Sequence, residues 1–210
     1  MLALEEWSIS GNDIEPEILR TYRDANAARD ARQSSLRILD IGAGAGRDLR
    51  YIRHGFTGVD LEVVAVEPNQ QYWVSIQREL QRWQLRGEVV GHLERTEGCF
   101  DVAVLQHVLC SVEAPEELLL QARQRLRPGG LLLFVEHMPP RFRGARWILR
   151  PLMKLCSCDL NVDAAELLSS LSWQALNFVR FQLFICGVEV PHIRGIAVKA
   201  SRPTNDFDFL

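Results

Sequence analysis

The sequence lacks the features of a membrane-spanning or secreted chain. No run of apolar residues approaches the roughly 18 that a spanning helix needs. Residues 1–17 contain neither a basic region nor an apolar core, so they predict no signal peptide. We therefore expect a cytoplasmic protein.

The sequence also lacks a strong net charge and a regular cysteine pattern. The formal net charge is −3, so the charge as a whole does not favour a nucleic-acid partner. The five cysteines include no C-x-x-C pair and no zinc-finger spacing, which is typical of reduced thiols in the cytosol. A C-x-C pair, Cys156 and Cys158, suits soft metals. The sequence shows no third ligand for it, so we expect no metal site.

No internal repeat and no low-complexity linker divides the 210 residues, of which 47% are hydrophobic. This length and composition predict one soluble domain with a full core. We expect a helical lead-in over residues 1–35, the main domain over 36–200 and a mobile tail over 201–210.

Strand and helix patterns alternate through most of the main domain. This alternation predicts a parallel sheet covered on both faces, with a ligand at the carboxyl edge of the strands. Two later strands predict an antiparallel hairpin joined around residues 186–191. The expected class is α/β, a doubly wound, seven-stranded, mostly parallel sheet with an antiparallel C-terminal edge hairpin. The expected strands cover 36–41, 62–67, 87–91, 100–106, 131–137, 173–185 and 192–200.

Three glycines, Gly42, Gly44 and Gly46, follow the first strand directly. Dinucleotide enzymes use G-x-G-x-x-G, and Arg47 stands where their third glycine would be. Asp40 lies at the end of the strand, where a carboxylate suits an ammonium group better than a diphosphate. S-adenosylmethionine has an ammonium, a sulfonium and no phosphate. The loop therefore favours this cofactor and disfavours a nicotinamide oxidoreductase.

An acidic residue, Glu67, closes the second strand 21 residues beyond Gly46. Such a residue accepts hydrogen bonds from both ribose hydroxyls, in dinucleotide enzymes as well, so it indicates adenosine without choosing the cofactor. Residues 91–94 lie where an adenine edge would be read, and residues 101–109 form the pocket floor. The expected cofactor-binding residues are Asp40, Gly42, Ala43, Gly44, Gly46, Glu67, Pro68, Leu93, Glu94, Gln106 and His107.

The segments "ILDIGAGAG", "VAVEPN", "FDVAV" and "LRPGGLLLFVEH" resemble the class I S-adenosylmethionine-dependent methyltransferases, over residues from about 36 to 199. The second half is similar to the methyltransferase-like protein 7 group, through "LCSV", "VEH", Cys158 and "PHIRGIAVK". This resemblance implies a Rossmann-like fold, S-methylation of alkyl thiols and attachment to endoplasmic reticulum and lipid-droplet membranes.

Two departures from that group limit what carries over. The group's hydrophobic N-terminal anchor has no counterpart here, so we do not expect membrane residence from it. Asn161 and Val162 stand where the group usually has a threonine–arginine pair, which leaves the acceptor open. A methyltransferase-fold binding module without turnover and a small-molecule O- or N-methyltransferase both remain alternatives.

Methyl transfer from a sulfonium is an in-line displacement, in which the protein mainly aligns the acceptor and excludes water. His107 is the candidate base, with packing or a place beside the ribose as the alternative. His137 faces the same edge, Glu136 orients the loop, and His192 belongs to the hairpin with a structural role. Cys110 and Cys158 match family positions, although such cysteines are commonly small buried hydrophobes.

Residues 141–156 combine a basic face with an apolar one. Arg146, Arg150 and Lys154 recur every four residues, and Pro151 predicts a kink. The segment fits a lid over the acceptor, a peripheral membrane contact or an ordinary surface helix. We expect a small-molecule acceptor and no nucleic-acid partner; the sequence gives no oligomeric state.

Overall fold

The structure is a computed structural model that describes residues 7–9, 14–29, 31–140, 158–159, 161–185 and 188–201. The basic segment over 141–156 and nearly all of the expected tail over 201–210 lie outside the described residues.

The described residues form one eight-stranded sheet with the order β1-β7-β8-β6-β5-β2-β3-β4. Strands β2 to β6 run parallel to their neighbours among themselves, whereas β8 is antiparallel to both β6 and β7. The doubly wound α/β prediction with its C-terminal antiparallel pair is confirmed; all seven expected strands are present, and β1 is an eighth. The strands are β1 (Trp7–Ile9), β2 (Ser35–Ile41), β3 (Asp60–Val66), β4 (Arg86–Val90), β5 (Phe100–Gln106), β6 (Leu126–His137), β7 (Ala175–Ile185) and β8 (Val188–Val198).

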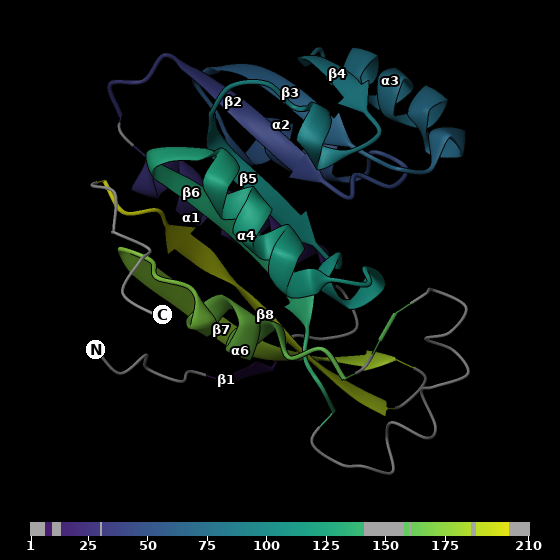
Figure 1. Cartoon of the computed structure of the whole chain (residues 1–210), viewed down its shortest axis with the longest axis vertical. Helices are drawn as coiled ribbons and strands as arrows, with labels where there is room; N and C mark the ends of the chain where they lie inside the picture. The colour runs from purple at the N-terminus through teal and green to yellow at the C-terminus, as the bar shows by residue number, and fades with distance from the viewer. Residues whose placement is uncertain are drawn as a thin grey trace.

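Helices cover both faces of the sheet, as Figure 1 shows, with α4 and α6 in front of the strands and α1 behind them. Helix α4 begins with a proline and two glutamates and has two arginines in its last turn, which matches the helix dipole. The Asp163 side chain caps α6 by accepting from the amides of Ala165 and Glu166. The α-helices are α1 (Glu15–Ala28), α2 (Asp48–Gly55), α3 (Trp73–Arg82), α4 (Pro115–Arg125) and α6 (Ala164–Ser170).

Each face of the sheet has its own apolar core because strand side chains alternate between the faces. Helices α1, α2 and α3 pack into one core, and α4 and α6 pack into the other. Each fully buried aliphatic or aromatic side chain stabilises the folded state by about 1.5–3 kcal/mol compared with the same side chain exposed to water. The helical side chains in the first core include Ile18, Tyr22, Leu49, Ile52, Ile76 and Leu80.

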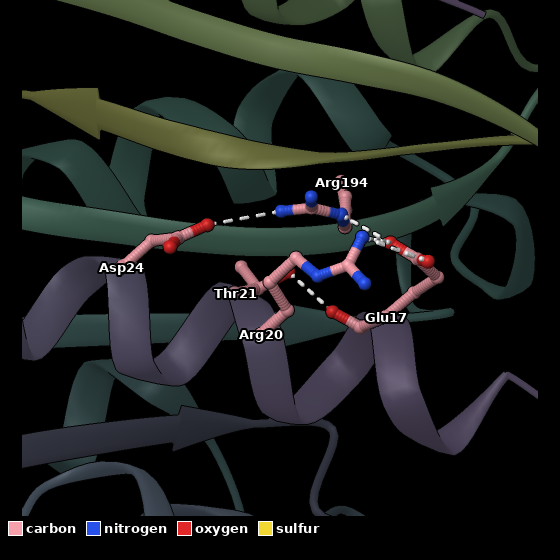
Figure 2. A network of polar contacts seen from close by, with 5 residues as sticks. All are labelled: Glu17, Arg20, Thr21, Asp24 and Arg194. Carbon is pink, nitrogen blue, oxygen red and sulfur yellow. Dashed lines mark hydrogen bonds and ion pairs between the residues drawn. The ribbon is translucent and has the colours of Figure 1, made fainter. Parts of the chain in front are cut away.

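An ionic network, in which the Arg194–Glu17 pair is buried, joins α1 to strand β8 (Figure 2). Arg194 donates from Nε to Glu17 Oε2 at 2.6 Å and from a terminal nitrogen to Asp24 Oδ2 at 3.1 Å. Arg20 also contacts the Glu17 carboxylate, at 3.2 Å, and Thr21 donates to the Glu17 carbonyl. The network ties the helix of the expected lead-in to the sheet.

Three features of the sheet differ most from the sequence expectations, and the other strand boundaries shift by no more than two residues. Strand β1, within the expected helical lead-in, pairs with β7, so the hairpin is not the outermost part of the sheet. Strand β6 begins at Leu126 rather than at the expected residue 131, and an irregularity in its pairing with β5 accommodates the Arg-Pro-Gly-Gly segment. Strand β8 begins at Val188 and contains Pro191, whose carbonyl accepts from the Met138 amide at 2.8 Å.

Candidate functional site

The glycine loop leaves the carboxyl end of β2 and crosses over the end of β3. The amides of Gly42 and Ala43 both donate to the Val66 carbonyl, at 2.9 and 3.1 Å. Gly42, Gly44 and Gly46 have φ values of 71°, 52° and 80°, a region that glycine enters without strain. A Cβ on Gly42 would lie 2.8 Å from a Val108 methyl, so the loop packs directly on the segment after β5.

Asp40 lies beneath this loop, only 1% exposed. Its Oδ2 has no hydrogen-bond partner among the described residues. Burial, followed by the nearby Glu67 carboxylate, raises the pKa of Asp40 to about 7. Burial and then Asp40 likewise raise the pKa of Asp48 well above its ordinary value. The base of the loop therefore holds two buried carboxyl groups with raised pKa values; Arg50 and Arg47 act on Asp48 in the opposite direction, whereas no cation does so on Asp40 among the described residues.

Glu67 follows β3 and fixes the loop from the other side. Its Oε2 accepts from the Gly44 amide and its Oε1 from the Asn69 amide, both at 2.8 Å. A carboxylate offers about four lone-pair positions, so each oxygen can accept a further bond from a ligand hydroxyl. Asn69 itself caps the short 3₁₀ helix that precedes α3 rather than α3 itself.

The segment after β5 brings His107 and Val108 to the same edge. The His107 amide donates to the Val135 carbonyl, and its backbone has φ 56°, which is uncommon for a residue with a side chain. Within the described residues, His107 Nε2 and Gln106 Oε1 are buried atoms without a hydrogen-bond partner. Burial, with smaller effects from His137 and His192, lowers the pKa of His107 well below its usual value. The imidazole is therefore neutral at physiological pH.

Glu136, at the end of β6, holds this segment in place. It is completely buried, and its Oε1 accepts from the amides of Val108 at 2.9 Å and Leu109 at 3.3 Å. Burial raises the pKa of Glu136 to about 8, although those two amides act in the opposite direction. The residue thus orients the loop, as the sequence indicated.

Histidines and cysteines gather next to this segment in what we call the His–Cys cluster (His107, Cys110, His137, Cys158 and His192). The His137 ring stacks on that of His107 with 4.4 Å between centroids and meets that of His192 edge-on at 4.6 Å. His137 Nδ1 lies 3.4 Å from Cys110 Sγ and 3.3 Å from Cys158 Sγ. Hydrogen bonding from Cys158, and then from His137, lowers the pKa of Cys110 to about 4 against the effect of burial.

The structure brings most of the expected site residues to one edge of the sheet, although three of them lie in the apolar core or on the surface. Asp40, the three glycines, Glu67 and His107 surround the ends of β2, β3 and β5. Leu93 is buried in the second apolar core, and Glu94 and Pro68 are exposed. The sequence reasoning did not include Asp48 in the site or join the cluster residues. The signal for the cluster was that Cys110 and His137 each follow a strand at the same edge.

No helix in the described part of the chain is both long and apolar enough to cross a membrane.

Comparisons with known proteins agree with this architecture. A family model described as a methyltransferase domain matches residues 14–181. Human thiol S-methyltransferase TMT1A is 28% identical over 178 residues, which cover 78% of this chain and 71% of that protein. Rat thiol S-methyltransferase TMT1B is 28% identical over 182 residues, which cover 77% of this chain and 70% of that protein.

Solved structures show the same fold at low identity. A putative methyltransferase from Bacillus halodurans superposes with a TM-score of 0.66 at 14% identity, covering 88% of this chain and 99% of that one. The plantazolicin methyltransferase BpumL in complex with SAH gives 0.60 at 14% identity, covering 88% and 84%. The chain belongs to the methyltransferase domain family and is an S-adenosylmethionine-dependent methyltransferase of the class I, Rossmann-like type.

Proposed function

We propose that this enzyme transfers the methyl group of S-adenosylmethionine to the sulfur of a small, apolar thiol. The similarity to two thiol S-methyltransferases over more than three quarters of the chain supports the acceptor class. The main support for the cofactor site is the buried Asp40 Oδ2, which has no hydrogen-bond partner among the described residues. It lies beneath a loop in which three glycines have positive φ values.

The residues at this edge fit the cofactor's polar groups. A buried acceptor without a partner costs about 1–3 kcal/mol, which a ligand's ammonium would offset at Asp40. Glu67 keeps lone pairs for the ribose hydroxyls while it holds the Gly44 amide. A Cβ at Gly44 would meet only the Gly42 carbonyl, at 3.9 Å, among the described atoms, so the loop leaves space for a ligand against bare backbone.

S-adenosylmethionine supplies a methyl group that is already activated by its sulfonium. The protein therefore has to hold the acceptor in line and exclude water. A thiol with a pKa near its ordinary value supplies some thiolate by itself, so a strong base is not required.

His107 suits the role of a hydrogen-bond acceptor for the thiol. Its Nε2 has no hydrogen-bond partner in the described part of the chain. Its lowered pKa disfavours the protonated imidazolium, so Nε2 can accept a hydrogen bond as a neutral imidazole. We expect His107→Asn, which tolerates the positive φ, to lower kcat about tenfold, below the roughly hundredfold minimum typical of general-base catalysis, because the thiol supplies some thiolate by itself.

An acceptor screen with methyl-labelled S-adenosylmethionine tests the function. The panel contains an alkyl thiol, a phenol and a primary amine at equal concentration, with Cys99→Ser as a control because Cys99 is exposed. We expect labelled thioether from the thiol, unchanged product in the control and none with Asp40→Asn. Methylated product from the phenol or the amine alone would reject a thiol as the acceptor, but the protein would still be a methyltransferase. Cofactor binding without product from any acceptor would favour a binding module.

A further inference from the structure

The His–Cys cluster contains more coordinating groups than methyl transfer requires. His137 Nδ1 lies between two sulfur atoms, 3.4 Å from Cys110 Sγ and 3.3 Å from Cys158 Sγ. The coordinating atoms of these three residues all lie within 4.8 Å of one another. We propose that Cys110, His137 and Cys158 bind a zinc ion and leave a fourth coordination position open to an outside ligand.

The distances agree with a tetrahedral ion. Zinc binds sulfur at about 2.3 Å and imidazole nitrogen at about 2.0–2.1 Å, so tetrahedral angles place nitrogen about 3.5 Å from each sulfur. The two nitrogen–sulfur distances, 3.3 and 3.4 Å, lie within about 0.2 Å of this value. The ligands could bind zinc with shifts of a few tenths of an ångström.

The backbone holds the three ligands in place although they are far apart in the sequence. The Asp159 amide donates to the Cys110 carbonyl at 2.6 Å, which fixes the residue after Cys158 against the one that carries the first thiol. His137 pairs in register with His192 across β6 and β8. Such organisation lowers the entropic cost of assembling a metal site.

The ligand set selects the class of ion. Two cysteine sulfurs and one imidazole are soft or borderline ligands, which suit zinc and related ions. Calcium and magnesium prefer oxygen ligands, and no carboxylate belongs to this group among the described residues.

The open position follows from the ligand count. Of the described residues, no fourth side chain joins the set within the same span; the neighbouring group of His107, His137 and His192 shares only His137 with it. Three protein ligands with one open position are the pattern of catalytic rather than structural zinc.

The place of the site suggests what fills that position. Cys110 follows Val108 in the segment that packs on Gly42, so the proposed zinc site adjoins the cofactor loop. Resting on the function proposed above, the fourth ligand is the acceptor thiol. Its proton leaves to solvent as the zinc–sulfur bond forms, and the thiolate gains a sulfur–carbon bond as the donor's sulfonium–carbon bond breaks.

Titration of the metal-free, phosphine-reduced full chain with Co²⁺ tests the site without any activity measurement. We expect one equivalent to bind, with sulfur-to-cobalt charge-transfer absorption and the intense visible bands of tetrahedral cobalt, and Zn²⁺ to displace it. Because this readout uses the unaltered protein, it does not depend on the folding of any variant. Binding without a sulfur band would assign the ion to the three histidines and overturn the proposal, as would the absence of binding.

Matched variants locate the ligands. Cys158→Ala removes one of two sulfurs, so we expect about half the charge-transfer intensity and at least about tenfold weaker Co²⁺ binding. Cys99→Ser, at an exposed cysteine, should match the unaltered protein. Equal behaviour of the two variants would contradict the assignment.

Two further measurements separate this proposal from the proposed function. Asp40→Asn should weaken cofactor binding and keep the cobalt spectrum. In the unaltered protein, a normal cobalt spectrum without methylation of any thiol rejects the thiol function alone. Addition of an alkyl thiol to the cobalt-loaded protein should shift the visible bands. An unchanged spectrum would reject the open position.

Discussion

The ionisation of Asp40 should control cofactor affinity between weakly acidic and weakly basic pH. The buried carboxyl has a pKa of about 7 in the empty protein, and only its ionised form is a full partner for an ammonium. The apparent dissociation constant scales inversely with the ionised fraction, which is about 90% near pH 8 and about 9% near pH 6. S-adenosylmethionine should therefore bind about tenfold more weakly at the lower pH.

Isothermal titration calorimetry over that pH range measures the effect directly. Asp40→Asn should remove the pH dependence and weaken binding at the higher pH by about 10- to 100-fold, the value of a hydrogen bond to a charged group. Asp48→Asn is the matched control, because Asp48 is also buried with a raised pKa but should leave the slope in place. A flat profile in the unaltered protein, or a slope that survives Asp40→Asn, would refute the reasoning.

The same substitution should stabilise the empty protein. The folded pKa of Asp40 exceeds its unfolded value of 3.8, so the unfolded state ionises first as pH rises. The contribution of Asp40 to the free energy of unfolding is therefore highest below its unfolded pKa. It falls as pH rises to about 7, by up to about 4 kcal/mol in total. Near pH 8, thermal unfolding of Asp40→Asn should occur at higher temperature, while near pH 4 the two proteins should unfold alike.

Three other substitutions test the loop, the ribose contact and the ionic network. Gly42→Ala should abolish cofactor binding in calorimetry because its Cβ would meet Val108 at 2.8 Å, whereas Gly58→Ala has a similar φ of 73° and no described atom within 4 Å, so it should bind normally. Glu67→Gln should weaken binding about fivefold, since a neutral acceptor contributes about 1 kcal/mol less than a charged one; equal affinity would argue against the ribose contact. Arg194→Met should lower the free energy of unfolding by about 3 kcal/mol in urea because the buried Glu17 loses a partner, and a loss below about 1 kcal/mol would show that Arg20 compensates fully.

Local patterns were enough to predict that the residues proposed for the cofactor lie at one edge of the sheet. An apolar strand that ends in Asp40, three glycines at alternate positions and an acid after the next strand each depend only on neighbouring residues. Parallel strands then bring their carboxyl ends together, so the sequence could place Glu67 beside the loop. The bulge in β6 was missed because Pro128 and Gly129 are compatible with both a helix end and a strand irregularity.

The His–Cys cluster could not be predicted in the same way because it depends on sheet order. Cys110 and His137 come together because β5 and β6 are neighbours, and His192 joins them because β8 enters antiparallel beside β6. Cys158 reaches them through a loop that the Asp159 amide ties to Cys110. Along the chain Cys110, His137, Cys158 and His192 are separated by 20 or more positions, so the C-x-C pair was the only metal pattern visible.

The two halves of the site are mechanically linked through one short segment. Val108 packs on Gly42 of the cofactor loop, and Cys110, two residues later, contributes to the His–Cys cluster. The buried Glu136 accepts a hydrogen bond from the Val108 amide of this segment. The next residue, His137, contributes its ring to the His–Cys cluster from the same strand end. A displacement of this segment would therefore change the cofactor loop and the proposed zinc ligands together. In the proposed arrangement, the donor and acceptor sites are thus both positioned from the end of β6, which is the alignment that an in-line transfer requires.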